Sequence, residues 1–251
     1  MTDLSHHIAI VTGSGAGIGA AIAERLAHDG AKVMMNDIDQ QRLDDVKARL
    51  IDQGIDETQL ATMAGDVSSE ADMKGLFEAT SDRLGALSLM VNNAGILQQK
   101  AFADLTLDDW DRMVAVHLRG SFLGCHFALP IMQQTGRGVI VNIASQLGQL
   151  GAAELVHYAS AKAAIIGLTK SLAREVGQSG IRVNAVAPGP INTELVLGLS
   201  KEWRDAKAAQ LPLGHFGEPS DVAATVAFLA SEDARIYVGQ TLGPNSGDVM
   251  L

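Results

Sequence analysis

The stretch IVTGSGAGIG at residues 10–19 decides the fold of this chain. It continues a short apolar run and leads directly into a segment with helical spacing. Glycines at such a strand-to-helix turn let backbone N–H groups approach a pyrophosphate, and the helix N-terminus adds the positive end of a dipole. The glycine spacing G-x-x-x-G-x-G therefore predicts a dinucleotide site, although an ordinary tight turn is the alternative. The candidate residues are Gly13, Ser14, Gly17, Ile18 and Gly19.

Short apolar runs alternate with longer segments of helical spacing along the whole chain. The runs are too short to be good helices and are bounded by Gly, Asp or Asn, which indicates buried strands. Such alternation implies right-handed crossovers and a doubly wound parallel sheet with helices on both faces. We therefore predict one α/β domain over residues 1–251. The predicted strands are residues 8–11, 32–35, 60–64, 87–91, 139–143 and 181–187, and the predicted helices are residues 18–28, 39–53, 70–84, 107–133 and 152–177.

The charge and cysteine content of the chain exclude several kinds of partner. A formal net charge of -10 opposes binding to nucleic acids or anionic membranes. The single cysteine, Cys125, cannot form an internal disulfide, and its apolar helical context predicts a buried structural thiol. No apolar run approaches the roughly 18 residues of a membrane helix, and the N-terminus does not resemble a signal peptide. We expect a soluble, cytoplasmic protein without a metal site.

Asp37 stands at the end of the second predicted strand. A carboxylate at this place accepts hydrogen bonds from the ribose hydroxyls of an adenosine and repels a 2′-phosphate. The glycine loop also offers no Arg or Lys to receive that phosphate. Both features predict NAD rather than NADP as the cofactor. The alternative is that Asp37 caps the next helix, for which Asp39 is better placed.

Small and polar residues also follow the third and fourth predicted strands. Asp66-Val67 comes after the third strand, and Asn93-Ala94-Gly95 comes after the fourth. Open parallel sheets bind ligands at the carboxyl ends of their strands, so both segments are candidates for the cofactor site. Taken alone, each is equally a turn or a helix cap.

Three side chains further along the chain can carry acid–base chemistry. Ser145 follows the strand at residues 139–143, and Tyr158 and Lys162 lie four residues apart in a helical segment, which puts them on one face. A tyrosine normally titrates near 10, and a nearby ammonium favours its phenolate. We therefore expect Lys162, helped by the positive charge of a nicotinamide, to lower the pKa of Tyr158 and make it a general acid or base. Ser145 could then hydrogen-bond the substrate oxygen.

In this combination and order, the motifs make the chain resemble the short-chain dehydrogenase/reductases. The resemblance implies a Rossmann fold of about seven parallel strands, a homotetramer, and hydride transfer between NAD(H) and a secondary alcohol or ketone. The matching residues are Gly13 to Gly19, Asp66, Val67, Asn92 to Gly95, Ser145, Tyr158, Lys162 and Pro188 to Pro190.

The resemblance also implies a role for each candidate residue. Ser145 would position the substrate oxygen, Tyr158 would transfer the proton, and Lys162 would tune Tyr158 and hold the nicotinamide ribose. The other residues that the resemblance places at the cofactor are Asp66, Val67, Asn93, Ala94, Gly95, Pro188, Gly189, Ile191 and Thr193.

The chain departs from the family pattern in two places. His117 stands where many members have an asparagine that helps to bind a water of the proton relay. An imidazole can still bind a water, but a histidine that only props the helix against the sheet is an equal alternative. Residues 239–247 differ from the usual end of the last strand, and Leu242-Gly243-Pro244 predicts that this strand is shortened or bent. We expect the second departure to affect assembly more than chemistry.

The sequence restricts the chemical class of the substrate but does not identify the substrate itself. An amphipathic segment at about residues 190–216 predicts a substrate-binding lid, with apolar side chains at Leu195, Leu197, Leu199, Trp203 and Leu211. No Arg or Lys is placed as a clamp for a carboxylate or phosphate, which favours a neutral alcohol, ketone, polyol or cyclic diketone. The alternatives are an NADP-dependent 3-oxoacyl-type carbonyl reductase and a catalytically silent NAD-binding scaffold.

Overall fold

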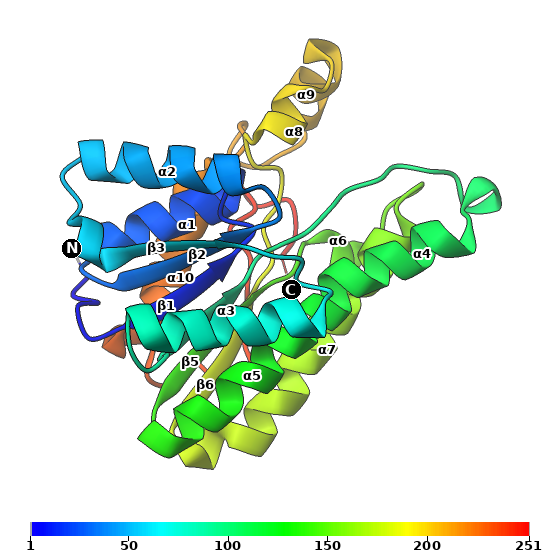
Figure 1. Ribbon diagram of the computed structural model, residues 1–251. Helices are drawn as coiled ribbons and strands as arrows, with labels where there is room; N and C mark the ends of the chain where they lie inside the picture. Colours follow the sequence, from blue (N-terminus) through cyan, green and yellow to red (C-terminus); the bar gives the residue numbers. More distant parts are fainter. Residues whose placement is uncertain (1, 251) are drawn as a thin grey trace.

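Apolar side chains alternate between two faces along β1 (Ile8–Thr12), as expected for a strand buried on both sides. Ala9 and Val11 belong to one core cluster, and Ile10 belongs to the other. The computed structural model describes residues 2–250, and Figure 1 shows the resulting sheet between two layers of helices. The first cluster lies under α1, α2 and α10, and the second lies under α3, α5 and α7.

Seven parallel strands form the sheet, in the order β3-β2-β1-β4-β5-β6-β7. All six predicted strands are present, and β7 is shortened to two residues, as the departure near Pro244 predicted. The order reverses between β1 and β4, and ligands bind in the crevice at such a switch point, beyond the carboxyl ends of the strands. The strands after β1 are β2 (Lys32–Asp37), β3 (Leu60–Ala64), β4 (Leu89–Asn92), β5 (Gly138–Ile143), β6 (Ile181–Val186) and β7 (Thr241–Leu242).

The five predicted helical segments are helical, but the prediction did not include α10, which covers the sheet beside α1. The sequence does indicate where α10 begins, because Glu218 and Asp221 form a capping box and Pro219 between them is favoured in the first turn of a helix. The helices are α1 (Gly17–His28), α2 (Gln40–Asp52), α3 (Glu70–Arg83), α4 (Leu107–Val114), α5 (Gly120–Thr135), α6 (Leu147–Leu150), α7 (Val156–Val176), α8 (Glu194–Leu197), α9 (Lys201–Ala208) and α10 (Pro219–Ala230).

The long helix predicted at residues 107–133 is not regular. A π-helical segment, Ala115–Arg119, separates α4 from α5 and contains the buried His117. Such single-turn π segments often occur at functional sites. Helical spacing in the sequence runs through this region without a break, so the apolar pattern could not reveal it.

The segment Leu107–Thr135 is long and apolar enough to cross a membrane by length and composition, although the sequence predicted no such helix. In the structure it contributes Leu123, Ala128 and Met132 to the core cluster under α3, α5 and α7. The core helix of a soluble protein passes the same length and composition test.

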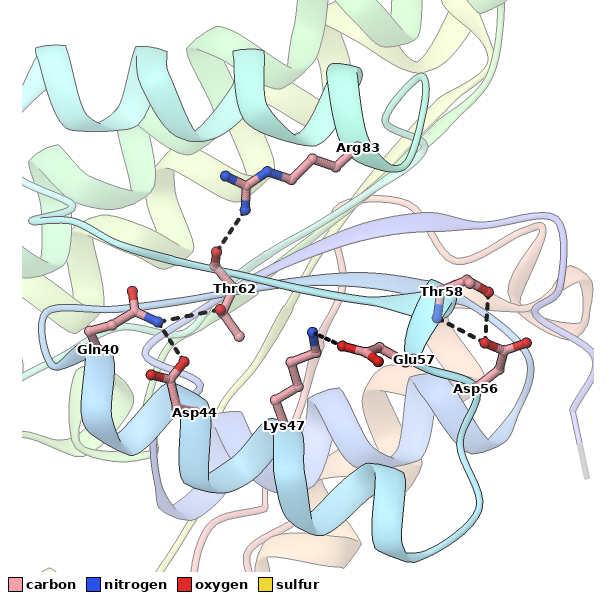
Figure 2. A network of polar contacts seen from close by, with 8 residues as sticks. All are labelled: Gln40, Asp44, Lys47, Asp56, Glu57, Thr58, Thr62 and Arg83. Atoms are coloured by element: carbon pink, nitrogen blue, oxygen red, sulfur yellow. Dashed lines mark hydrogen bonds and ion pairs between the residues drawn. The ribbon is translucent and has the colours of Figure 1, made fainter.

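The edge strand β3 is protected by side chains from the helices on both sides of it (Figure 2). Arg83 of α3 donates to the carbonyl oxygen of Thr62 at 3.1 Å, and Gln40 of α2 contacts the hydroxyl of Thr62 at 3.3 Å. Gln40 also accepts a hydrogen bond from the backbone N–H of Ala64. These contacts satisfy backbone groups that an exposed edge would offer to another strand.

The predicted lid segment projects from the body of the molecule as α8 and α9 (Figure 1). Leu197, Leu199 and Trp203 are exposed, whereas Leu211 is buried. The side chain of Leu195 lies outside what the structure describes. An apolar, exposed segment beside the strand ends agrees with a lid, and its movement stays a prediction.

His7 lies directly before the central strand β1, at the amino ends of the strands. Its burial makes the free energy of unfolding depend on pH. Its Nδ1 contacts Ser88 Oγ at 2.9 Å, and its Nε2 contacts the carbonyl oxygen of Ala230 at 3.1 Å. Burial is the main cause that lowers the pKa of His7 from 6.5 to about 4. Between these values the unfolded chain binds a proton at His7 that the folded chain does not bind.

We therefore expect the free energy of unfolding to fall as the pH drops below 6.5, with a contribution from His7 of about 2 kcal/mol between pH 7 and pH 5. The substitution His7→Gln should reduce this dependence by that amount. Urea denaturation at the two pH values measures it, and His28→Gln, at an exposed position on α1, is the matched control. An unchanged difference between the two pH values in His7→Gln would contradict the prediction.

Candidate active site

The glycine loop between β1 and α1 is packed too tightly for side chains. A Cβ on Gly19 would collide with the carbonyl oxygen of Gly13, and a Cβ on Gly13 would lie 2.7 Å from the Cα of Ala94. Gly13 and Gly17 have φ values of +64° and +53°, which favour glycine. The glycines therefore let the loop pack closely on the residues after β4, and binding of a phosphate at the N-terminus of α1 stays a prediction.

Asn93 joins this loop to the loop after β4. Its Nδ2 atom donates to the carbonyl oxygens of Thr12 at 2.9 Å and Gly13 at 3.1 Å. In return, Thr12 Oγ1 accepts hydrogen bonds from the backbone N–H groups of Asn93 and Ala94. The predicted cofactor residues Gly13, Asn93 and Ala94 thus lie side by side at one strand edge.

Asp37 ends β2 with its carboxylate turned toward the glycine loop. Its Oδ2 atom accepts a hydrogen bond from the backbone N–H of Gly15 at 3.0 Å. The capping role falls to Asp39 instead, whose side chain accepts from the N–H groups of Gln41 and Arg42. The structure therefore separates the two aspartates, and Asp37 is not the cap of α2.

Arg42 is a residue that the sequence analysis missed. It lines a cavity of about 300 Å³ beside the glycine loop, together with Gly15, Ala16 and Arg49. The Cβ of Arg42 is so close to Gly15 that a side chain there would meet it at 2.9 Å. The loop itself holds no basic residue, but α2 brings arginines to its side. The first turn of a helix packed on the loop was the signal that could have revealed Arg42.

The side chains of Asp66 and Val67 make packing and hydrogen-bond contacts in the turn that follows β3. Asp66 Oδ1 accepts hydrogen bonds from the N–H and the hydroxyl of Ser68, both at 2.8 Å. Val67 packs against Gly120, where a Cβ would come within 2.9 Å of it. The turn interpretation of Asp66 is therefore present in the structure, and its role at a cofactor stays a prediction.

Ser145, Tyr158 and Lys162 come together at the carboxyl end of β5. Ser145 follows this strand, and its Oγ accepts a hydrogen bond from the N–H of Leu147 at 3.1 Å. Tyr158 and Lys162 lie one turn apart on α7, and Lys162 Nζ is 5.7 Å from the centroid of the Tyr158 ring. Lys162 also donates to the carbonyl oxygen of Ile143 at 2.7 Å, which fixes its direction.

Burial decides the protonation of this group. It lowers the pKa of Lys162 from 10.5 to about 7. It also raises the pKa of Tyr158, and a hydrogen bond with Ser145 opposes that effect. In the structure the loss of solvation raises the pKa of Tyr158, and the lowering expected from Lys162 together with a nicotinamide charge stays a prediction. A proton at Lys162 is held loosely at neutral pH, whereas Tyr158 is a protonated donor.

His117 faces Tyr158 from the π-helical segment, with ring centroids 5.3 Å apart and an edge-on angle of 89°. Its Nε2 lies 2.8 Å from the carbonyl oxygen and 3.1 Å from the nitrogen of Ile96. Its Nδ1 is buried without a partner. Burial lowers the pKa of His117 to about 3, so the ring is neutral. The propping role considered from the sequence is therefore present, toward the loop after β4.

Gly95 is required by this ring. A Cβ on Gly95 would lie 2.5 Å from the Cε1 atom of His117. The predicted cofactor residue Gly95 thus has a packing reason of its own. It lets the loop after β4 approach the π-helical segment, which brings His117 beside Tyr158.

The loop after β6 meets the glycine loop and the loop of Ser145. Thr193 lies next to Gly17, where a Cβ would come within 3.5 Å of its methyl group. Pro188 accepts a hydrogen bond from the N–H of Gln146 at 3.0 Å, and Ile191 is buried. The predicted residues of this loop therefore lie between the cofactor side and the catalytic side of the site.

The C-terminal residues contact the turn that carries Ser145, and the expected effect of residues 239–247 on assembly stays a prediction. Asp248 accepts a hydrogen bond from Gln146, the neighbour of Ser145, at 2.6 Å. The same carboxylate binds Lys207 of α9. Sequence distance hid this contact, since 102 residues separate Gln146 from Asp248.

Comparisons with known proteins agree with this arrangement. A family model described as enoyl-(acyl carrier protein) reductase matches residues 13–247. The chain is a short-chain dehydrogenase/reductase. The 3-oxoacyl-(acyl-carrier-protein) reductase FabG of Vibrio cholerae is 37% identical, with 99% of this chain and all (100%) of that protein covered.

Two further proteins are similar to this chain over nearly its whole length. The levodione reductase of Leifsonia aquatica is 39% identical over 98% of this chain and 95% of its own. A crystal structure of a Brucella melitensis protein described as short-chain dehydrogenase/reductase, glucose/ribitol dehydrogenase, superposes with a TM-score of 0.93. It is 34% identical and covers 100% of this chain and 99% of that chain. The protein is therefore an oxidoreductase of this family.

The family uses a nicotinamide cofactor, and the residues of this chain fit one. The glycines of the loop allow close backbone packing, and α1 begins at Gly17, where the first N–H groups of a helix are available to a phosphate. Asp37 and Arg42 flank the loop on the adenosine side. Tyr158 and Lys162 lie at the other end of the same strand edge.

His117→Leu should cost about 1 kcal/mol of stability, because it leaves partly buried backbone groups of Ile96 without their polar partner. Urea denaturation measures the loss. The matched control is His126→Leu, an exposed histidine of α5 that stacks on Phe122. Equal stability of the two variants would contradict the structural role of His117.

Proposed function

We propose that the protein transfers a hydride between NAD(H) and a secondary alcohol or ketone. The observation that carries the choice of NAD is the carboxylate of Asp37, turned toward Gly15 at the end of β2. A ribose with two free hydroxyls can donate to this carboxylate, whereas a 2′-phosphate would meet a like charge. Among the predicted cofactor residues, Ser14 and Ile18 would line the phosphates beside the loop glycines.

The protein's part in the reaction is to bind the substrate oxygen and move a proton. The cofactor supplies or accepts the hydride. Ser145 Oγ donates a hydrogen bond to the substrate oxygen, and the phenol of Tyr158 gives its proton to that oxygen in reduction, or removes it in oxidation. Lys162 Nζ, with a pKa near 7, can release or take up a proton beside Tyr158, and it would also hold the nicotinamide ribose. The positive charge of an oxidised nicotinamide would also favour the phenolate.

His117 takes a further role in this proposal. In the tautomer that donates from Nε2 to Ile96, the buried Nδ1 carries a lone pair without a partner. A water donating to Nδ1 would satisfy it and extend a proton path from Lys162. The same His117→Leu variant should then lower kcat while NADH affinity stays near that of the wild type.

The substrate proposed is neutral and carries no large anionic group. Lys100 and Lys207, on the loop after β4 and on α9, are both paired with aspartates at 2.6 and 2.7 Å. Neither is available to clamp a phosphate or carboxylate. The similarity to a levodione reductase supports a cyclic diketone or related ketone. The similarity to 3-oxoacyl reductases supports the alternative, an NADP-dependent reductase of 3-oxoacyl thioesters.

A catalytically silent NAD-binding scaffold is the other alternative. Two observations argue against it: the hydrogen bond between Ser145 and Tyr158, and the position of Lys162 Nζ 5.7 Å from the centroid of the Tyr158 ring. Normal NADH binding without turnover over a panel of ketones, diols and 3-oxoacyl thioesters would favour the scaffold instead.

We further propose a cytoplasmic homotetramer. The large apolar side chains exposed on the surface support assembly, since single domains rarely leave such patches uncovered. Phe122 of α5 is 49% exposed and stacks on His126. Ile236 and Val238, beside β7, form a second group. The buried, unpaired Cys125 agrees with a reducing compartment.

Fluorescence titration should show that the wild type binds NADH more tightly than NADPH. Asp37→Ala should tighten NADPH binding on the order of tenfold, because it removes one of the carboxylates that oppose a 2′-phosphate, while Arg42 still lines the cavity beside Asp45 and Glu194. The double variant Asp37→Ala with Arg42→Gln should lose that gain. Preference of the wild type for NADPH would overturn the assignment of NAD and favour the 3-oxoacyl reductase.

Tyr158→Phe should fold, bind NADH with affinity close to that of the wild type, and lose roughly 10²- to 10⁴-fold in kcat. Only the phenolic proton donor is removed, while the ring still packs against His117. Steady-state kinetics with the most active substrate of the panel measure the loss. Retention of normal turnover would contradict the proposed proton transfer.

A further inference from the structure

The C-terminal residues 244–248 contact three parts of the candidate site, namely the loop after β6, the lid segment and the turn that carries Ser145. Pro244 accepts a hydrogen bond from the N–H of Gly189 in the loop after β6, at 3.1 Å. Ser246 accepts one from the N–H of Leu213, at the end of the lid segment, at 3.2 Å. Gly247 packs on Pro212 so closely that a Cβ would come within 2.7 Å. The tail therefore contacts both the cofactor side and the lid.

One carboxylate in this tail binds two separate elements. Asp248 Oδ2 accepts a hydrogen bond from Gln146 Nε2 at 2.6 Å, and Oδ1 accepts one from Lys207 Nζ at 2.9 Å. Only 14% of the Asp248 side chain and 26% of the Lys207 side chain are exposed. Such a shielded pair is screened less by salt than a surface pair.

The carboxylate also fixes the orientation of the Gln146 amide. An ionised carboxylate only accepts hydrogen bonds, so Gln146 must present its NH₂ group to Asp248. Its Oε1 atom then faces Gly189, where a Cβ would lie 2.8 Å away, and is buried without a partner. Because the N–H of Gln146 also donates to Pro188, the turn that carries Ser145 is held from two sides.

We propose that Asp248 is a positioning residue that couples the lid helix α9 to the turn carrying Ser145. Docking of α9 through Lys207 orders the Asp248 carboxylate, and the ordered carboxylate orients Gln146 beside Ser145. Closure of the lid and alignment of the substrate-binding hydroxyl then become one event. The importance of this coupling for turnover rests on the role proposed for Ser145, but the coupling itself can be measured without a substrate.

The first experiment is hydrogen–deuterium exchange on the full chain. Lys207→Met should increase exchange several-fold at residues 195–210 and also at residues 145–151, which Lys207 does not contact. The matched control is Lys201→Met, which removes an exposed ion pair with Asp205 on the same helix. This control should leave exchange unchanged both at residues 145–151 and in the tail. A change confined to the lid in Lys207→Met would overturn the proposal.

The second experiment is a double-variant cycle on kcat/KM. Gln146 and Lys207 share Asp248 as their common partner, so the proposal predicts that Gln146→Leu and Lys207→Met together are no worse than Asp248→Ala alone. Asp248→Ala should raise KM and lower kcat, whereas its NADH affinity should stay near that of the wild type. If the fold-losses in kcat/KM of Gln146→Leu and Lys207→Met multiply in the double variant, the two residues act independently. That result would overturn the coupling. A failure of the proposed function would appear differently, as an absence of turnover in every form while the exchange result stands.

Discussion

The side-chain amide of Asn93 carries the contact on which the rest of the site depends. It spans the gap between the first and fourth strands, where the strand order reverses, and it binds two carbonyl oxygens of the glycine loop. Because both donors of this amide are used, the loop cannot move away from the sheet without leaving polar groups unsatisfied. Gly13 and Gly19 then follow from geometry, since a Cβ on either would come within 2.7 Å of a backbone atom.

Burial of charge is the second constraint, and it acts at the other end of the same edge. Lys162 is almost wholly enclosed, and no carboxylate lies within ion-pair distance of it among the described residues. Its hydrogen bond to Ile143 compensates only part of the lost solvation, so the lysine holds its proton weakly. A neutral His117 and a protonated Tyr158 complete the group. The site is thus prepared for proton movement by desolvation rather than by paired charges.

Much of this architecture could be predicted from the sequence, because parallel strands buried on both faces appear as short apolar runs between glycines and polar turns. The capping role of Asp39 and the shortening of the last strand could be predicted for similar local reasons. The π-helical segment could not, since one extra residue in a helical turn does not disturb the apolar pattern. Arg42 and Asp248 were missed because their importance arises from packing between elements. The effect of burial on the pKa of Tyr158 could not be predicted, because the sequence shows a neighbouring charge but not the depth of burial.

The shortness of β7 has a consequence for how molecules of this protein can meet. The sheet ends on one side at β3, whose Thr62 carbonyl is occupied by Arg83, and on the other side at a strand of two residues. Neither border offers a row of free backbone groups long enough to accept a strand from another molecule. What this border offers instead are exposed apolar side chains such as Ile236 and Val238.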